Sequence, residues 1–331
     1  MGRRRTIEVL LTTAGDTNVQ KEILESDEMI LWISIAVLVV LVAILGVLIV
    51  TRKNKEKKKQ GSRTEQIMNV NVQEEISADN NAQFVIGKLH NVGKRSTQQD
   101  SFAVSDENDE NLCREKGLIA IVADGMGGLS DGDKISSMVT LSLLKHFYEK
   151  PLADFPGDTL LDMLKNANRE VNAFLKNKTE RCGSTLVTGI IKNKKLYYLS
   201  VGDSHIYLYR GGNLLQLNRE HTYREELDLK VVNEEISMKE AIVNPQRTAL
   251  TSYIGMGQLE KIDKNSSPVE LQKGDRLIFA TDGVFGTMKE NQIASVMQYP
   301  VEESIRRMNE WIQAVGKSNQ DNYTAVVIEC R

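Results

Sequence analysis

The hydrophobic pattern is dominated by an uncharged run over residues 29–50, MILWISIAVLVVLVAILGVLIV. A helix rises about 1.5 Å per residue, so this run is long enough to cross the ~30 Å hydrocarbon core of a bilayer. A cleaved signal peptide has a shorter apolar stretch closer to the N-terminus, and a buried soluble helix would need apolar neighbours on every side. The pattern therefore predicts a single transmembrane helix over 29–50.

Charges on the two sides of this run predict its orientation. Acidic residues precede it, and basic residues follow it at Arg52, Lys53, Lys55, Lys57, Lys58 and Lys59. Basic flanks are retained in the cytoplasm, so we expect 1–28 to be a short extracytoplasmic segment and the rest of the chain to be cytoplasmic. The basic run suits anionic lipid, which makes the lipid bilayer an expected partner. The predicted location is the cell membrane, with a single pass.

A polar stretch separates the membrane run from the remaining apolar pattern. Residues 60–83 are rich in Gln, Asn, Glu and Ser and carry no sustained apolar period, which is typical of a linker. We therefore expect a basic juxtamembrane run and linker over 51–83. A folded domain is expected over 84–331.

Two kinds of apolar periodicity occur within that domain. Short apolar runs predict strands over 117–123, 184–191, 196–201, 276–280 and 324–328. Apolar residues at helical spacing predict helices over 135–148, 160–174 and 301–315. Many strands follow one another directly, which favours an α+β fold with antiparallel sheets.

Charge and cysteine content exclude several classes of function. The net charge of −3 leaves no global basic field for holding nucleic acid, so nucleic acid is not an expected partner. Cys113, Cys182 and Cys330 are widely spaced and form no CxxC pair, which indicates free thiols in a reducing compartment.

Three aspartates each lie at the end of an apolar run. Asp124 follows LIAIVA, Asp282 follows LIFAT, and Asp321 precedes the strand predicted at 324–328. Glycine follows Asp124 and Asp282, which lets the backbone turn sharply and bring a carbonyl close to a ligand. Hard cations such as Mg²⁺ and Mn²⁺ prefer carboxylate, carbonyl and water oxygens. Any single Asp-Gly pair is also a common turn, so the metal interpretation depends on the whole set.

The surrounding motifs occur in a characteristic order. They are RSTQQD at 95–100, DGMGG at 124–128, GSTL at 183–186, GDS at 202–204, LTSYIG at 250–255 and DNYT at 321–324. In this order the sequence resembles the metal-dependent protein phosphatases of the 2C type in their bacterial form, over 84–329. The resemblance implies a four-layer sandwich of two antiparallel sheets flanked by helices, with metals in a cleft at one end of the sheets.

The resemblance also implies a set of metal ligands for two Mn²⁺ or Mg²⁺ ions. Asp124 would bridge both ions, the Gly125 carbonyl would bind one, and Asp282 and Asp321 would bind the other. Asp100 would complete or orient the shell of the second ion. Two dications lower the pKa of a shared water and supply hydroxide for in-line attack on phosphorus.

Further roles and departures follow from the same resemblance. Arg95 matches the arginine that contacts phosphate, which suits a bidentate guanidinium. Asp203 is a candidate for a third metal or for support of the other ligands, and a simple turn is an equal alternative. Position 126 is Met where eukaryotic relatives usually have a histidine proposed as general acid. His205 replaces the usual Arg, so the proton donor for the leaving group is unassigned, and His221 is expected to pack or cap.

We therefore expect hydrolysis of phosphoserine and phosphothreonine on proteins, in opposition to protein kinases. A catalytically silent, membrane-tethered domain that binds phosphoproteins or relays a signal is the alternative, motivated by the departures at Met126 and His205. A two-metal nuclease would use similar chemistry but should show a basic groove.

Overall fold

The apolar runs form two antiparallel sheets in the computed structural model, which describes residues 84–127, 131–178 and 181–331. The first sheet has the order β1 (Phe84–Asn91), β12 (Tyr323–Cys330), β11 (Arg276–Ala280), β7 (His205–Arg210) and β8 (Asn213–Gln216). The second has the order β10 (Val269–Glu270), β6 (Lys195–Val201), β5 (Leu186–Lys192), β3 (Leu118–Met126) and β2 (Asp100–Val104). Two short strands, β4 (Gly183–Ser184) and β9 (Asp263–Lys264), pair with β3 and β6. All five predicted strands are present, and the run 184–191 is divided between β4 and β5.

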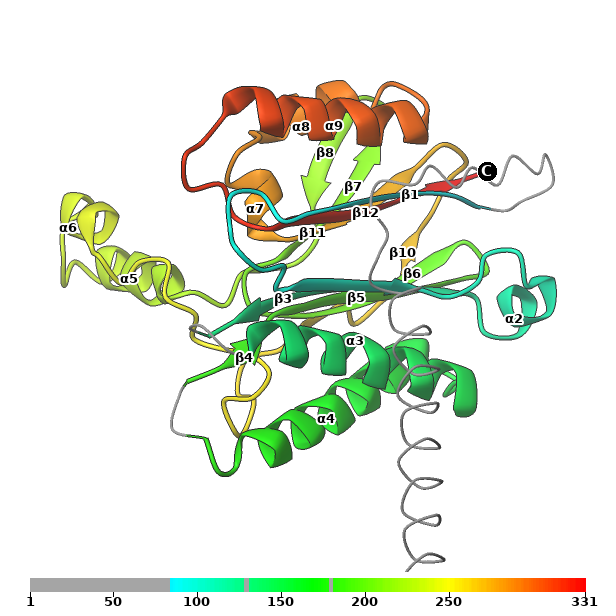
Figure 1. Cartoon of the computed structure of the whole chain (residues 1–331), viewed down its shortest axis with the longest axis horizontal. Coiled ribbons are helices and arrows are strands. Elements are labelled where there is room, and N and C mark those ends of the chain that lie inside the picture. Colours follow the sequence, from blue (N-terminus) through cyan, green and yellow to red (C-terminus); the bar gives the residue numbers. More distant parts are fainter. Residues whose placement is uncertain (1–83, 128–130, 179–180) are drawn as a thin grey trace, which may run out of the picture. The chain divides into compact units, whose positions relative to one another are not determined.

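Helices cover the outer face of each sheet, which gives four layers (Figure 1). The helices α3 (Gly132–Glu149) and α4 (Pro156–Leu175) pack on the second sheet, and α8 (Glu290–Val296) and α9 (Val301–Val315) pack on the first. A separate core lies between the sheets and contains Val122, Val187, Phe279 and Val326. The predicted sandwich of antiparallel sheets flanked by helices is therefore confirmed.

The three predicted helices are confirmed, and their ends have local causes. The α9 helix coincides with the predicted range and ends at Gly316, whose left-handed φ of 63° suits glycine at a helix C-terminus. The α4 helix begins with Pro156, which is tolerated in the first turn because no N–H is needed there. The hydrophobic pattern did not predict the shorter helices α2 (Glu110–Glu115), α5 (Tyr223–Val232), α6 (Met238–Val243), α7 (Asp282–Phe285) and α8.

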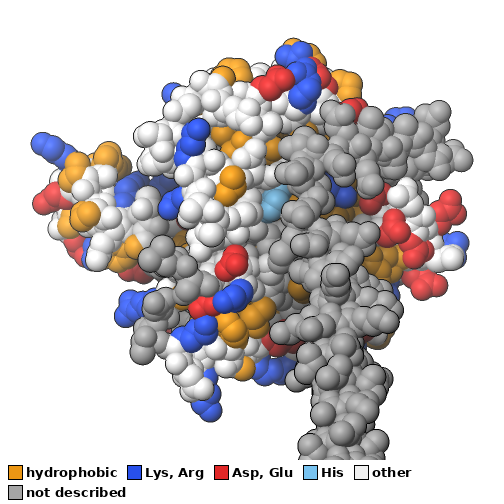
Figure 2. Space-filling model, viewed as in Figure 1, with side chains coloured by type: hydrophobic (Ala, Val, Ile, Leu, Met, Phe, Trp, Pro, Cys, Tyr) orange, Lys and Arg blue, Asp and Glu red, His pale blue; other side chains and the backbone are white. Residues whose placement is uncertain are grey.

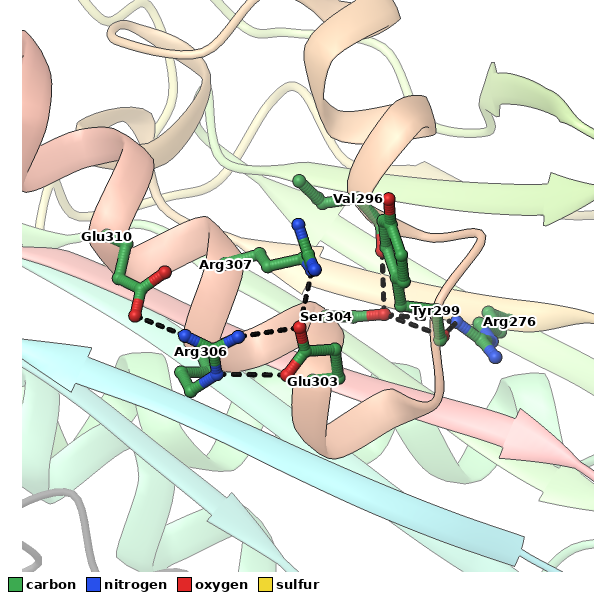
Figure 3. A network of polar contacts seen from close by, with 8 residues as sticks. All are labelled: Arg276, Val296, Tyr299, Glu303, Ser304, Arg306, Arg307 and Glu310. Carbon is green, nitrogen blue, oxygen red and sulfur yellow. Dashed lines mark hydrogen bonds and ion pairs between the residues drawn. The ribbon is translucent and has the colours of Figure 1, made fainter.

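A buried arginine fixes the turn between α8 and α9 against the first sheet (Figure 3). Arg276 on β11 donates to the backbone carbonyls of Met297 (2.6 Å) and Tyr299, and pairs with Glu329 on β12 at 2.6 Å. Ser304 in the first turn of α9 donates to the carbonyl of Val296 at 2.8 Å. These bonds hold α8 and α9 on the strand that leads to Asp282.

The helices α5 and α6 contact each other and project from one end of the sandwich (Figure 1). The α6 helix has a capping box, in which Ser237 and Glu240 satisfy each other's backbone N–H groups. Exposed apolar side chains gather on this projection (Figure 2), at Leu229, Val232, Met238, Ile242 and Val243. These side chains therefore contribute nothing to the core between the sheets or to the cores between each sheet and its helices.

No helix within 84–127, 131–178 and 181–331 is long and apolar enough to cross a bilayer. The transmembrane helix predicted over 29–50 lies outside the described residues, as do the segments 1–28 and 51–83. These assignments stay predictions.

Candidate active site

Four strand ends bring the predicted site residues to one end of the sandwich. Asp100 and Asp124 are direct partners across β2 and β3. Asp282 begins α7 immediately beyond β11, and Asp321 lies just before β12. Since β11 and β12 are antiparallel, the end of one adjoins the start of the other, and the N–H of Thr281 donates to the carbonyl of Thr324 at 3.0 Å. Asp203 follows β6. The term aspartate cluster is used below for Asp100, Asp124, Asp203, Asp282 and Asp321.

Asp100 joins the two sheets and carries an unsatisfied oxygen. Its Oδ2 accepts hydrogen bonds from Thr281 (2.9 Å), the residue after β11, and from Thr324 (2.7 Å) on β12. Its Oδ1 is buried without a hydrogen-bond partner. Burial raises the pKa of Asp100 to about 7. A buried carboxylate oxygen without a partner is costly, and a bound cation is one way to satisfy it.

Asp124 lies among other carboxyls on a rigid backbone. Its N–H donates to Thr185 Oγ1 at 3.1 Å, and its carbonyl accepts from Ser184 Oγ at 3.0 Å. Burial, followed by the charges of Asp100 and Asp282, raises the pKa of Asp124 well above its usual range. The Asp124 side chain in turn lowers the pKa of Asp282 by hydrogen bonding, against the larger effect of burial. Carboxyls this close share either a proton or a cation.

The remaining aspartates lie within the same electrostatic field. Burial and then Asp321 raise the pKa of Asp282, and burial and then Asp282 raise the pKa of Asp203 to about 7. Asp203 lies in the turn between β6 and β7, and it is also close enough to Asp282 for the two charges to interact. Both alternatives given for Asp203, a turn residue and a neighbour of the metal ligands, are therefore compatible with its position. Among the described residues, no three His, Cys, Asp or Glu side chains already converge on one point as ligands. The donor set is all oxygen and suits Mg²⁺ or Mn²⁺, and its side chains would have to reorient around an ion.

Arg95 contacts the aspartate cluster through Asp321. Its Nη2 lies 2.6 Å from Asp321 Oδ2, and this hydrogen bond raises the pKa of the guanidinium. The two side chains are 57% and 41% exposed, so the pair faces solvent and can exchange partners at low cost. The predicted phosphate contact therefore lies beside the predicted metal ligands.

Asn322 holds the loop that carries Arg95. Its amide donates to the carbonyls of Val92 (2.8 Å) and Thr97 (3.0 Å), and accepts from the N–H of Gln99 at 2.8 Å. Asn322 is not among the site residues predicted from the sequence. The only signal for it was its place beside Asp321 in the DNYT motif. Thr281 and Thr324, which hold Asp100, were missed in the same way.

Two glycines after Asp124 are required by close packing. A Cβ at Gly125 would lie 2.1 Å from the carbonyl oxygen of Gly132. Gly127 has φ +125°, and a Cβ there would lie 2.7 Å from Sγ of Cys182. Cys182 is buried, as expected for a small apolar thiol. The backbone at Gly125, a predicted carbonyl ligand, is therefore fixed by its neighbours.

The two histidines near the GDS motif are packed. His205 donates or accepts hydrogen bonds at Glu220 (2.7 Å) and Tyr207 (2.6 Å), and its ring stacks on Phe285 at 3.6 Å. His221 Nδ1 accepts from the N–H of Gly202 at 3.1 Å, which confirms the expectation that His221 packs. His205 therefore connects the segment before α5 with α7.

Comparisons with known proteins agree with this geometry. The family model described as "Protein phosphatase 2C" matches residues 87–322. The serine/threonine protein phosphatase PstP of Mycobacterium tuberculosis is 29% identical over 245 residues, which are 71% of this chain and 44% of PstP. The chain thus spans less than half the length of that relative. The serine/threonine phosphatase stp of Listeria welshimeri is 28% identical over 222 residues, 64% of this chain and 84% of stp.

Solved structures share the fold. The PPM Ser-Thr phosphatase MsPP of Mycobacterium smegmatis, in complex with cacodylate, is 28% identical with a TM-score of 0.60, covering 74% of this chain and 98% of MsPP. The catalytic domain of PstP in complex with 2 manganese ions is 24% identical with a TM-score of 0.59, covering 74% of this chain and 97% of that domain. The family match extends over most of the described residues and includes the whole aspartate cluster. The chain therefore belongs to the protein phosphatase 2C family.

Proposed function

We propose that this chain is a metal-dependent protein phosphatase that hydrolyses phosphoserine and phosphothreonine on proteins. The observation that carries this proposal is Asp100, which is buried with one oxygen unsatisfied among four further aspartates, beside a solvent-facing arginine. Carboxylates this close can all be ionised only when cations are bound among them. Bound cations would also supply the positive charge that attracts a phosphate ester.

The roles of the ligands follow from their positions. Two Mn²⁺ or Mg²⁺ ions would be held by Asp100, Asp124, Asp282 and Asp321, together with the Gly125 carbonyl. Asp203 would either bind a third ion or support the other ligands. When bound, these ions supply a hydroxide near neutral pH by lowering the pKa of water. Arg95 would exchange Asp321 for two phosphate oxygens and so orient the ester.

Substrates and location belong to the same proposal. The substrates would be phosphorylated proteins made by a serine/threonine kinase. The uncharged run 29–50 and the basic residues that follow it support a single-pass anchor in the lipid bilayer, with the domain cytoplasmic. Fractionation of cells, followed by carbonate extraction, tests the anchor. Recovery of the full chain in the soluble fraction would contradict it.

The activity is tested on the full chain in detergent micelles with a phosphothreonine peptide. We expect Mn²⁺ to support phosphate release, EDTA to abolish it, and Asp282→Asn to lower kcat/KM by at least about 100-fold, or roughly 2.7 kcal/mol. A silent phosphoprotein-binding domain would instead bind the peptide without releasing phosphate. Equal rates for the wild-type chain and Asp282→Asn would contradict the proposal.

A further inference from the structure

A small polar pocket adjoins the aspartate cluster. It has a volume of about 140 Å³ and shares Asp282 and Asp321 with the cluster, and the rest of its wall includes Thr287, Lys317, Asn319 and Gln320. Glycine completes the lining, and no aliphatic or aromatic side chain contributes to it. The side chains that a guest would meet in the pocket are therefore polar or charged.

Gln320 gives this pocket a fixed frame. Its side chain is buried, accepts a hydrogen bond from Thr287 Oγ1 at 2.7 Å, and donates to the carbonyl of Gly283 at 2.9 Å. Its backbone N–H donates to the carbonyl of Lys317 at 3.2 Å, and its carbonyl accepts from the N–H of Lys94 at 2.9 Å. The turn that carries Lys317 is thereby tied both to α7 and to the loop that carries Arg95.

Lys317 is the cation of the pocket. Its ammonium donates to the carbonyl of Gly286 at the end of α7, and it forms no ion pair within the described part of the chain. An ammonium has three donors, so two stay available once Gly286 is bound. Arg95, by contrast, already has a carboxylate partner in Asp321. Lys317 is therefore a partly buried positive charge without an ion-pair partner among the described residues, and the two carboxylates in the pocket wall, Asp282 and Asp321, belong to the aspartate cluster.

We propose that Lys317 is a specificity-determining residue, which binds the carboxylate of an acidic side chain flanking the phosphorylated residue of the substrate. This inference rests on the proposed function. Arg95 contacts Asp321, which also lines the pocket, and an extended peptide advances about 3.3–3.6 Å per residue, so a side chain that flanks a phosphoryl group bound to Arg95 would be within reach of the pocket. A basic flanking residue would meet Lys317 as a like charge, and an apolar one would find no aliphatic or aromatic side chain to pack against.

The test uses phosphothreonine peptides that differ only in the two residues flanking the phosphothreonine, which are Glu, Gln or Lys. The full chain in micelles with Mn²⁺ should show a kcat/KM about fivefold higher for the Glu peptide than for the Lys peptide, as expected for one partly exposed ion pair. Lys317→Ala should bring this ratio to about one, and Lys317→Glu should invert it. High salt should shrink the wild-type preference.

A matched control separates a local effect from a change in overall charge. Lys165 on α4 is 65% exposed and lies in the layer beneath the second sheet, so Lys165→Glu should keep the wild-type ratio. The inference is overturned if Lys317→Glu leaves the ratio unchanged while the peptides are still hydrolysed. If the wild-type chain hydrolyses none of the peptides, the proposed function itself fails, and the inference fails with it.

Discussion

Thr324 on β12 donates a 2.7 Å hydrogen bond to Asp100 on β2, and so connects the two sheets at the aspartate cluster. Thr281 donates to the same carboxylate oxygen at 2.9 Å and also accepts from the N–H of Thr324 at 3.0 Å. The three side chains are buried together. The position of Asp100 therefore depends on residues from both sheets.

Removing the Thr324 hydroxyl should destabilise the protein. Thr324→Val keeps the size of the side chain but takes one donor from a buried carboxyl, which typically costs about 1–3 kcal/mol. Chemical denaturation in EDTA, followed by circular dichroism, measures this loss. Thr324→Ser keeps the hydroxyl and serves as the control, with a smaller expected loss. If the two variants lose the same stability, the hydroxyl is not responsible.

The stability of the metal-free protein should fall as the pH rises. Burial raises the pKa of Asp100 and of Asp203 to about 7 in the folded state, above the usual value near 3.9. The carboxyls of Asp100 and Asp203 therefore bind protons more tightly in the folded protein than in the unfolded chain. The resulting stabilisation is complete below about pH 4 and is lost as the pH passes about 7.

Mn²⁺ should reverse this trend, because metal binding requires ionised carboxylates. Thermal unfolding in EDTA and in Mn²⁺, at about pH 5.5 and about pH 8, measures both effects. We expect the increase in Tm caused by Mn²⁺ to be larger at the higher pH. A smaller increase there would mean that the aspartates are not the ligands.

Arg95 should contribute to substrate binding and little to stability. A hydrogen bond to a charged group is worth about 1.5–3 kcal/mol, so Arg95→Ala should lower kcat/KM for a phosphopeptide by about 10- to 100-fold. Arg95→Lys should recover only part of this, because an ammonium lacks the bidentate fork. Both variants should keep the wild-type Tm, since the pair with Asp321 is largely exposed. Wild-type kcat/KM in Arg95→Ala would exclude a phosphate contact.

Asn322 should act on the substrate through Arg95. Asn322→Ala removes three hydrogen bonds to the loop at Val92, Thr97 and Gln99, and should raise KM for the phosphopeptide as well as lower stability. A double-mutant cycle with Arg95→Ala distinguishes the two effects. In the Arg95→Ala background, Asn322→Ala should add little to KM. Fully additive effects on KM would show that Asn322 acts independently of the arginine.

The parts of the fold and site that sequence reasoning found have strong local signals. The apolar runs before Asp124 and Asp282 mark buried strands, and a polar residue at the end of such a strand is easily placed at a sheet edge. The α9 helix was predicted with the same ends because its apolar period is regular and Gly316 terminates it. The ordered motifs then placed Arg95 and Asp100 near the same edge.

The parts that sequence reasoning missed depend on tertiary structure. Asn322, Thr281 and Thr324 are ordinary polar residues until the fold brings them to the Arg95 loop and to Asp100. The helices α5 and α6 bury only Leu227 and Ala241, so their sequences carry no clear apolar face. The pocket at Lys317 depends on Gln320, whose contacts come from α7 and the Arg95 loop.

The most direct test of the central claim is a calorimetric titration of Mn²⁺ into the metal-free full chain in micelles, compared with Asp124→Asn. Asp124 is expected to contact both ions, so the wild-type chain should bind two Mn²⁺ per chain, and the variant should lose most of that binding while keeping its fold. Absence of binding by the wild-type chain at millimolar Mn²⁺, or unchanged binding by Asp124→Asn, would contradict a metal centre built on the aspartate cluster.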